Sequence, residues 1–454
     1  MRRWGLNKVQ IARAAAACAL SAGLVACERG APSSSTASTS APVAPPALAS
    51  EIATAPLRVA TYRISVESLP APYASASKAK PPRVIDPPAD ATLRVPPGFR
   101  VQLFAETPGA RWLANTPDGD VLVTSKSGST ITRLRDTNGD GVADERSVFA
   151  DPSNGMNLPF GIVFVDGLCF VANTDAVLRF RWEPGQERLI GRGSAIVQLP
   201  GQGYNQHWTR NLAVAPDGEH LFVSVGSMSN VSEESPPRAC VLRVNLFGTE
   251  REVYAFGLRN PVGLAVHPAT GALFTAVNER DLLGDDLVPD YFTEVEQGAF
   301  YGWPYAYLAP TLLDPRMMRE GVSIRPDLAA TTRTPDVLFE SHSAALGATF
   351  HSASDWPKHY RTGAFVAFHG SWNRSSGTGY KLVYLPFDEA GKPTGAYEDF
   401  VTGFLTDPSG PRAWGRPVCV LSRPDGSLLF SDDGHGRVYR ITFDPALAAQ
   451  MAGE

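Results

Sequence analysis

One short unit recurs along the chain from Gly98 onward: a β-rich run, a tight turn and a second β-rich run. Several copies carry Pro-Asp-Gly at the turn, where Pro presets φ, Asp caps locally and Gly accepts a positive φ, and the flanking Val, Ile, Leu and Phe runs are typical of strands. Six copies begin at Leu113, Gly161, Leu212, Gly263, Gly347 and Val420. The first four are about 50 residues apart, which is the spacing of propeller blades. The repeats therefore predict an all-β fold, a six-bladed β-propeller.

The composition agrees with a turn-rich globular protein. The 454 residues include 41 Gly and 38 Pro, and 43% of them are hydrophobic, which is enough apolar material for a sizeable core. The formal net charge is −5 without a basic tract, which argues against a nucleic-acid-binding protein. Cys169, Cys240 and Cys419 lie in or beside strand-like runs and can form at most one disulfide among themselves. We expect at least one of them to be a small buried hydrophobe.

The N-terminal part of the chain lies outside the repeats. Residues 1–26 contain basic residues and a short apolar run and end in a small-residue stretch before Cys27, which is typical of a lipoprotein signal peptide with Cys27 as the lipidation site. An ordinary signal peptide with an incidental cysteine is the alternative. Residues 27–68 are rich in Ser, Thr, Ala and Pro and predict a flexible, disordered tether. We expect the propeller domain over residues 69–445 and a C-terminal tail over 446–454.

Four segments at the ends of the repeats carry polar residues in a fixed order. They are Asn205–Arg210 (NQHWTR), Tyr254–Pro261 (YAFGLRNP), Asn278–Asp281 (NERD) and Phe368–Arg374 (FHGSWNR). Together they resemble the soluble quinoprotein sugar dehydrogenases, the family of PQQ-dependent glucose and L-sorbosone dehydrogenases; the last segment resembles the sorbosone-dehydrogenase branch. The resemblance covers about residues 69–443, and it implies PQQ as cofactor and a six-bladed propeller as fold.

The resemblance assigns catalytic roles to two residues. Oxidation of a sugar hydroxyl moves a hydride to an electrophile, which PQQ supplies, and a proton to a base, for which histidine is suited near neutral pH. His207 matches the family's catalytic histidine; a histidine hydrogen-bonded only for structure is the alternative. The glucose branch has Asp before this histidine, whereas this chain has Gln206, so the group that orients His207 stays open. Arg259 and Asn260 match the pair at the reactive quinone edge, and Arg259 is the second predicted catalytic residue.

Further basic residues at blade ends are predicted to bind the cofactor. PQQ carries three carboxylates, which suit the guanidinium fork of arginine. Arg416 matches a cofactor arginine of the family, and His369 falls where the glucose branch places a lysine. The predicted cofactor-binding set is Arg111, Arg210, Arg259, Asn260, Arg280, His369, Arg374 and Arg416. For Arg111 and Arg374, a surface ion pair is an equally favoured interpretation.

Two parts of the chain are candidates for Ca²⁺. The family holds Ca²⁺ partly through backbone carbonyls, which by position would be those near Arg280 and Asp281. Asp285 and Asp286 could serve a second ion or only a turn. A separate acidic segment (DTNGDGVAD) has oxygens at positions one, three, five and nine of a calcium loop but Ser147 at position twelve, so it is not an EF-hand. Its candidate ligands are Asp136, Asn138, Asp140 and Asp144. A hairpin turn is an equally favoured interpretation of this segment.

We expect an enzyme that oxidises an aldose or a sorbosone-like sugar with PQQ. Because the chain has no C-x-x-C-H haem motif, electrons would pass to an external acceptor, a cytochrome or a quinone. The expected location is the periplasm, with a lipid anchor as the only membrane contact; Glu28 after the cysteine favours the outer membrane. Two alternatives remain. A calcium-dependent lactonase on a similar propeller would need clustered carboxylates at the channel, and a binding propeller would have kept the fold without catalysis.

Overall fold

The computed structural model describes residues 51–201 and 207–452. They belong to one compact unit, Leu48–Glu454. The predicted signal peptide and the predicted lipidation site Cys27 lie outside the described residues, as does Gln206. The α-helices among the described residues are α1 (Pro326–Ala329) and α2 (Pro445–Ala452), and none of the described helices is long and apolar enough to cross a membrane.

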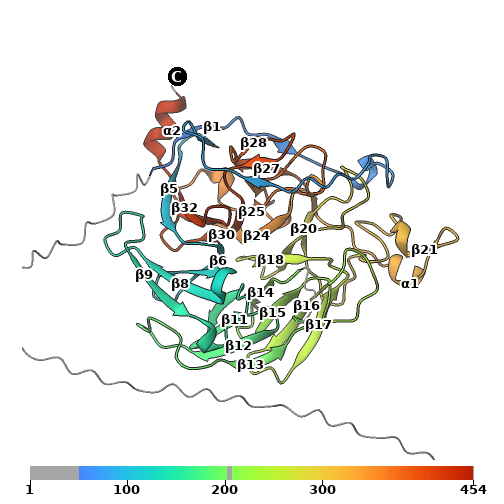
Figure 1. Cartoon of the computed structure of the whole chain (residues 1–454), viewed down its shortest axis with the longest axis horizontal. Helices are drawn as coiled ribbons and strands as arrows, with labels where there is room; N and C mark the ends of the chain where they lie inside the picture. The colour runs from blue at the N-terminus through green and yellow to red at the C-terminus, as the bar shows by residue number, and fades with distance from the viewer. Residues whose placement is uncertain (1–50, 202–206, 453–454) are drawn as a thin grey trace, which may run out of the picture. The chain divides into compact units, whose positions relative to one another are not determined.

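Most of the described chain forms antiparallel sheets of four or five strands (Figure 1). In three of them the strands follow one another in chain order. The first comprises β6 (Ala110–Asn115), β7 (Val121–Ser125), β8 (Thr130–Arg135) and β9 (Glu145–Ala150). The second comprises β10 (Ile162–Val165), β11 (Leu168–Ala172), β12 (Ala176–Arg181) and β13 (Ser194–Gln198). The third comprises β14 (Arg210–Val214), β15 (His220–Val225), β16 (Cys240–Asn245) and β17 (Arg251–Phe256).

Three further sheets bring in strands from distant parts of the chain. The fourth comprises β18 (Pro261–Val266), β19 (Leu273–Val277), β20 (Tyr291–Glu294) and β23 (Val337–Leu338). The fifth comprises β24 (Ala345–Phe350), β25 (Ala364–Phe368), β26 (Lys381–Leu385), β27 (Tyr397–Val401) and the N-terminal β2 (Thr61–Tyr62). The sixth comprises β30 (Pro417–Ser422), β31 (Leu428–Asp432), β32 (Arg437–Phe443) and β5 (Phe99–Glu106). Because β5 pairs with β32, the first and last parts of the domain close one sheet together.

The first strands of these sheets form a closed ring. Each contacts the next, in the order β6, β10, β14, β18, β24, β30 and back to β6, and the labelled members lie near the middle of the domain in Figure 1. Glycines that begin three of the repeats make this close approach possible. A Cβ on Gly161, Gly263 or Gly347 would lie 2.4–2.6 Å from the backbone of the neighbouring first strand. Buried side chains such as Trp112, Val262 and Val418 fill the space between the sheets.

The repeats found in the sequence are the first two strands of each sheet. The predicted turns fall at the connections, for example between β6 and β7, where Gly119 has a φ of 93°. The predicted β fold is confirmed, and the closed ring of sheets is the arrangement of a β-propeller. All three described cysteines are free and buried, as the sequence predicts for at least one of them.

The folded domain begins earlier than the sequence predicts. Residues 54–62 fall in the predicted tether, yet β1 (Thr54–Pro56) pairs in parallel with β4 (Leu93–Val95). The adjacent strand β2 pairs with β27, and its Tyr62 ring stacks on Tyr397 with centroids 4.8 Å apart. A few larger side chains in this Ser- and Pro-rich stretch are enough to join it to the domain. At the other end, the predicted tail is largely helix α2.

Besides the pair of β1 and β4, two smaller groups of strands complete the described sheets. The short strands β28 (Leu405–Asp407) and β29 (Arg412–Ala413) join β3 (Arg83–Val84) in a three-stranded sheet. An insertion between β20 and β23 carries α1 and the hairpin of β21 (Met318–Arg319) and β22 (Val322–Ser323), which project at the edge of the domain in Figure 1.

Candidate functional site

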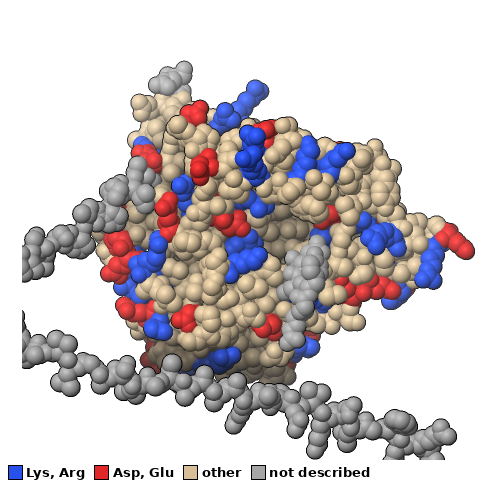
Figure 2. All heavy atoms as spheres, in the orientation of Figure 1, with Lys and Arg blue, Asp and Glu red and all other residues tan. Residues whose placement is uncertain are grey.

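A cavity of about 290 Å³ lies where the first strands begin and the second strands end. In the view of Figure 2 the domain is hollowed near its middle, with Lys and Arg side chains beside the hollow. The residues that line the cavity are His207, Arg259, Asn260, Asn278, Glu279, Asp281, Asp290, His342, Ala344 and Trp372. The structure therefore brings together both predicted catalytic residues, one further predicted cofactor residue, Asn260, and the predicted metal-site residue Asp281.

His207 stands just before β14, held by the loop that follows β15. Its Nδ1 lies 2.9 Å from the carbonyl oxygen and 3.1 Å from the Oγ of Ser227. Since a carbonyl can only accept, we assign the proton to Nδ1, which leaves a lone pair on Nε2. Removal from water lowers the pKa of His207 well below its usual value, and the positive charge of Arg259 lowers it further. The ring is therefore neutral near pH 7, which a proton acceptor requires.

Arg259 is fixed by main-chain and side-chain acceptors. Its side chain is 2% exposed. Nη1 donates to the carbonyl oxygen of Glu279 at 2.7 Å, and Nε donates to that of Asn230 at 3.1 Å. Nη2 donates to Asn230 Oδ1 at 3.0 Å and lies 3.5 Å from the Asp281 carboxylate. These contacts hold the cation rigidly at the cavity wall.

Two carboxyl groups that line the cavity are deeply buried. Burial raises the pKa of Glu279 to about 7 and that of Asp290 to about 6. Asp290 accepts hydrogen bonds from the backbone N–H groups of Glu279 at 2.8 Å and Ala344 at 2.6 Å. Both carboxyl groups therefore titrate close to neutral pH, whereas an exposed carboxyl group is fully ionised there.

His342 lies at the same cavity beside the Asp281 carboxylate. Although burial opposes it, contacts with the Asp281 carboxylate raise the pKa of His342. Its Nδ1 lies 3.4 Å from Asp281 Oδ1, and its Nε2 lies 3.0 Å from the carbonyl oxygen of Gly284. When protonated, the ring can donate to both acceptors, and its contacts link Asp281 to the neighbouring loop.

Three predicted cofactor residues meet around one carboxylate beside the cavity. Asp433 accepts hydrogen bonds from Arg111 and from His369 Nε2, the latter at 2.8 Å. Arg416 Nη2 donates to His369 Nδ1 at 3.0 Å. The cluster adjoins the cavity, because the backbone N–H of His369 donates to the carbonyl oxygen of Ala344 at 3.0 Å. Arg111 thus forms an ion pair, which was the predicted alternative, and it also lies in the cluster next to the cavity.

Burial and the two arginines set the charge of this cluster. Burial lowers the pKa of His369 to about 4, with Arg416 as the next contributor, so the ring is neutral. Although burial opposes it, the contact with His369 and the positive charges of Arg111 and Arg416 hold the pKa of the Asp433 carboxyl far below its usual range. The cluster of Arg111, His369, Arg416 and Asp433 therefore keeps a net positive charge.

Three predicted cofactor residues are placed otherwise. Arg210 is fully buried and donates to the carbonyl oxygen of His207 at 2.6 Å, so it supports the main chain rather than facing the cavity. Arg280 forms a buried ion pair with Asp314 at 2.7 Å. Arg374 donates to the carbonyl oxygen of Asp285 at 2.8 Å. In each case a nearby acceptor engages the guanidinium, and none of the three side chains is among the described residues that line the cavity; that they bind the cofactor stays a prediction.

The acidic segment of residues 136–144 forms the connection between β8 and β9, as the hairpin interpretation expects. Its side chains accept from its own backbone, for example Asp136 Oδ1 from the N–H of Gly139 at 2.7 Å. Asp144 is engaged in the same way by Thr137 at 2.9 Å. Across the described ranges, no group of three or more His, Cys, Asp or Glu side chains is arranged to hold a metal ion. Asp136, Asn138, Asp140 and Asp144 thus serve the hairpin in this structure.

Asp285 and Asp286, the other acidic pair, interact with a neighbouring loop. Asp285 Oδ1 accepts from the backbone N–H of Ser375 at 3.0 Å, and Asp286 pairs with Arg374 at 2.9 Å. These contacts link both carboxylates to another loop, and the use of either for a second ion stays a prediction.

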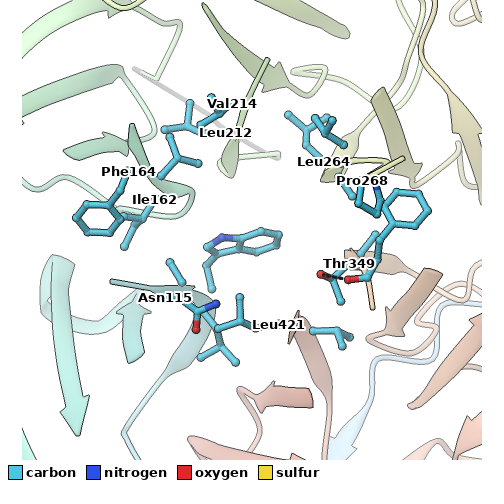
Figure 3. Close-up of a pocket in the computed structure, with 18 of the residues that line it drawn as sticks. Asn115, Ile162, Phe164, Leu212, Val214, Leu264, Pro268, Thr349 and Leu421 are labelled. Atoms are coloured by element: carbon cyan, nitrogen blue, oxygen red, sulfur yellow. Dashed lines mark hydrogen bonds between the residues drawn. The ribbon is translucent and has the colours of Figure 1, made fainter. Parts of the chain in front are cut away.

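A larger cavity, of about 590 Å³, lies at the carboxyl ends of the first strands (Figure 3). The side chains labelled there come from several sheets and surround one space. They include Ile162, Phe164, Leu212, Leu264 and Leu421. No ionisable side chain is among the described residues that line this cavity. The acid–base and charge-binding chemistry is therefore concentrated in the smaller cavity.

Several cavity residues were not predicted from the sequence. Asn278 and Glu279 belong to a recognised segment, so their position in that segment could have indicated them. Asp290 and His342 lie in no motif, and Trp372 is part of FHGSWNR without an obvious role in the sequence. Trp372 is 43% exposed, which makes it the most accessible aromatic side chain of the described cavity wall.

The chain is similar in sequence or in fold to several known proteins. A protein of Borreliella burgdorferi without an assigned function is 28% identical over 368 residues, 78% of this chain and 91% of that protein. A pyrroloquinoline quinone-dependent pyranose dehydrogenase of Coprinopsis cinerea is 24% identical over 77% of this chain, which spans 54% of its length. The calcium structure of Trichoderma reesei carbohydrate-active enzymes family AA12 superposes with a TM-score of 0.66 at 19% identity, covering 80% of this chain and 98% of that one.

The solved relatives show the fold. It is shared with AA12 and with the PQQ domain of the Coprinopsis enzyme, which superposes with a TM-score of 0.65 at 20% identity. The model of the TrAA12-like family matches residues 93–289 and 326–444, well over half of the chain. These two ranges contain all the residues that line the smaller cavity except Asp290. The chain therefore belongs to the TrAA12-like family.

Proposed function

We propose that the protein is a quinoprotein dehydrogenase that oxidises a sugar hydroxyl, with PQQ as cofactor and His207 as base. The observation that carries the proposal is the state of His207. Its ring is neutral, Nδ1 is engaged by Ser227, and the Nε2 lone pair is left at a cavity whose wall holds the Arg259 cation. A base beside a fixed cation is suited to hydroxyl oxidation, where a proton leaves while negative charge develops on the electron acceptor.

The residues present fit PQQ. The ligand is a polar trianion, and the cluster of Arg111, His369, Arg416 and Asp433 supplies net positive charge beside the cavity. The buried polar atoms that lack a hydrogen-bond partner among the described residues include Arg111 Nε and Asn260 Oδ1. Unsatisfied buried donors and acceptors are costly, so a bound polar ligand would satisfy them. PQQ, when bound, supplies the electrophilic carbonyl that accepts the hydride.

In this proposal the chain's own residues bind, orient and move one proton. Arg259 and Asn260, which line the cavity, would hold the bound cofactor there. His207 takes the hydroxyl proton at Nε2, and the hydrogen bond from Nδ1 to Ser227 stabilises the imidazolium that forms. Relatives whose names describe PQQ-dependent sugar and pyranose dehydrogenases support this class of substrate. The finer identity of the sugar, aldose or sorbosone-like, belongs to the proposal.

Calcium is part of the proposal on the family resemblance alone. The carbonyl oxygen of Asp281, a predicted ligand, already accepts from Asn230 Nδ2 and from Arg280 Nε, both at 3.1 Å. It does not fit a Ca²⁺ ligand in this arrangement. Dialysis against a chelator, followed by PQQ titration with and without added Ca²⁺, tests the requirement; equal affinity in both conditions would exclude it.

The experiment that tests the function begins with the purified apo-protein. PQQ binding is measured from the cofactor's absorbance, and sugar-dependent reduction of an artificial dye is then measured across a panel of aldoses and ketoaldoses. We expect binding, turnover with at least one sugar, and loss of turnover in His207→Ala with retained PQQ affinity. Absence of PQQ binding, or full turnover in that variant, would contradict the proposal.

A lactonase is the second candidate, because Glu279, Asp281 and Asp290 do line one cavity. Clustered carboxylates are what that reaction would need for Ca²⁺. Two of them, however, already receive backbone N–H groups or have raised pKa values from burial. Hydrolysis of lactones by the protein without PQQ would favour this candidate.

We further propose that the six sheets are six blades, and that the protein is exported and lipid-anchored at Cys27 in the periplasm, on the outer membrane. Electrons would pass to a cytochrome or quinone, because the chain carries no haem-attachment motif. Metabolic labelling with a fatty acid, compared with a Cys27→Ser variant, tests the anchor.

A further inference from the structure

The loop after β15 touches both residues to which catalysis is assigned. Ser227, at its start, accepts from Nδ1 of His207 and donates its backbone N–H to the carbonyl oxygen of Arg259 at 2.8 Å. Asn230, three residues later, contacts Arg259 and Asp281. The separation between the base and the cation is therefore set largely by one short loop.

The side-chain amide of Asn230 both accepts and donates hydrogen bonds. Oδ1 accepts from Arg259 Nη2 at 3.0 Å and from the backbone N–H of Asp281 at 2.9 Å, while Nδ2 donates to the Asp281 carbonyl oxygen at 3.1 Å. This pattern needs a neutral group with an acceptor and a donor side by side, which an amide provides. An aspartate would turn an acceptor toward the Asp281 carbonyl, and an alanine would leave all three partners unmatched.

The main chain of Asn230 also contacts Arg259. The Asn230 carbonyl oxygen accepts from Arg259 Nε at 3.1 Å and from the Trp303 indole N–H at 3.0 Å. The loop is fixed from its other side by Glu234, whose carboxylate accepts from the backbone N–H groups of Met228 at 2.7 Å and Ser229 at 2.8 Å. Asn230 is thus held in place independently of the arginine that it holds.

Two N–H groups of the guanidinium, Nε and Nη2, are engaged by this one residue. Arginine has several rotatable bonds, so an unrestrained side chain would lose conformational freedom when a ligand binds. Contacts that fix it beforehand make the site ready for an anionic ligand. Asn230 lies outside all four sequence segments that resemble the family.

We infer that Asn230 is a positioning residue, which holds the Arg259 guanidinium at the cavity wall and at a fixed distance from His207. The inference rests on the proposed function only for its effect on cofactor binding and turnover. Its effect on the geometry of the apo-protein stands without that function, so the two can be tested separately.

The test compares three variants with the wild type. Asn230→Ala removes the side-chain contacts with Arg259 and Asp281. Trp303→Phe removes a hydrogen bond to the same loop without touching Arg259, and it controls for a general loss of stability. Asn245→Ala changes an asparagine at the end of β16 that contacts Thr249 in a surface turn, and it controls for the substitution itself.

The first readout needs neither cofactor nor turnover. The pKa of His207 is measured in the apo-protein by NMR titration of its ring. The positive charges that act on this ring are those of Arg259, Arg210 and Arg238, and the backbone of Ser227 is its hydrogen-bond partner. If Asn230→Ala releases Arg259, the pKa of His207 rises by about half a unit or more. Trp303→Phe and Asn245→Ala leave it at the wild-type value.

The second readout is PQQ affinity, followed by the steady-state constants. We expect Asn230→Ala to raise the Kd for PQQ about tenfold or more, because contacts with a charged group are lost, and to lower kcat more than it changes KM for the sugar. Trp303→Phe lowers the melting temperature with an unchanged Kd. Should Asn230→Ala not fold, Asn230→Gln is measured instead; its longer amide cannot keep all three contacts, and the same shifts are expected.

Each outcome decides one question. A raised pKa of His207 together with weaker PQQ binding supports the positioning role. An unchanged pKa of His207 in a folded Asn230 variant overturns it, as does a shift of equal size in Trp303→Phe. If the wild type binds no PQQ, the proposed function fails, while the titration of the apo-protein still decides the role of Asn230.

Discussion

The buried ion pair between Arg280 and Asp314 gives a direct test of how the structure reassigns a predicted cofactor residue. Their side chains are 2% and 3% exposed, and Arg280 Nη1 lies 2.9 and 2.7 Å from the two carboxylate oxygens. The substitution Arg280→Met retains most of the side-chain volume but leaves the Asp314 carboxylate buried without its cation. Breaking a buried pair in this way costs about 3–5 kcal/mol of unfolding free energy. For a domain of about 400 residues, that corresponds to a fall of about 4–6 °C in melting temperature.

Scanning calorimetry of the apo-protein measures this effect, and the same insertion supplies a matched control. Arg325 and Asp327 also form an ion pair at 2.7 Å, but their side chains are 44% and 62% exposed. Because water screens such a pair, Arg325→Met should leave the melting temperature essentially unchanged. The two variants thus remove the same kind of contact at the same distance and differ in burial.

A role of Arg280 in binding PQQ would give a different result. If Arg280 bound a carboxylate of PQQ, Arg280→Met would weaken PQQ binding while the melting temperature of the apo-protein stayed unchanged. We expect the opposite: a lower melting temperature and a Kd for PQQ within about threefold of the wild type. Equal melting temperatures for Arg280→Met and Arg325→Met would likewise contradict the role given to burial.

Three further predictions follow from the cavity. The pKa of His207 is held well below its usual value, and the reaction needs the unprotonated ring. The pH profile of kcat/KM should therefore fall on its acid side only below about pH 6.5, as His207 becomes protonated. A fall that begins above this pH would contradict the assignment of His207 as the base. A Cβ at Gly226 would lie 2.4 Å from Asn260 Oδ1, so Gly226→Ala should weaken PQQ binding in a titration, whereas Gly410→Ala, with nothing within 4 Å, should not. Asp433→Ala removes the one negative charge of this cluster and should lower the Kd for the PQQ trianion, measured by absorbance; an unchanged Kd would show that the cluster is not part of the site.

Much of the fold could be predicted because the sequence patterns that specify its turns and strands are local. A turn such as that at Gly119 and a strand-like run on each side specify two paired strands without reference to the rest of the chain. Glycines such as Gly263 mark the close approach of first strands, although only the structure shows what they approach. The tether boundary was misplaced, because pairing of β1 and β2 depends on partners at Leu93–Val95 and Tyr397–Val401 that local composition does not reveal.

The candidate site likewise contains residues that the sequence predicts and residues that only the structure identifies. His207, Arg259 and Asn260 meet because each directly precedes the first strand of its sheet, so the repeat itself carries them to one end of the ring. Asn230 and Asp433 belong to no recognised segment, and nothing in the local sequence distinguishes them from other polar loop residues.

The sequence by itself determined the repeated strand–turn–strand unit, the end of that unit at which polar residues gather, and the family that these residues resemble. Only the tertiary structure decided which arginines face the cavity. Arg280 meets Asp314 from an insertion, and Arg111 meets Asp433, 322 residues away along the chain. The physical reason is the range of the interactions. Turn and strand preferences act between neighbours, whereas the direction of a long charged side chain is set by whichever acceptor the completed fold brings next to it.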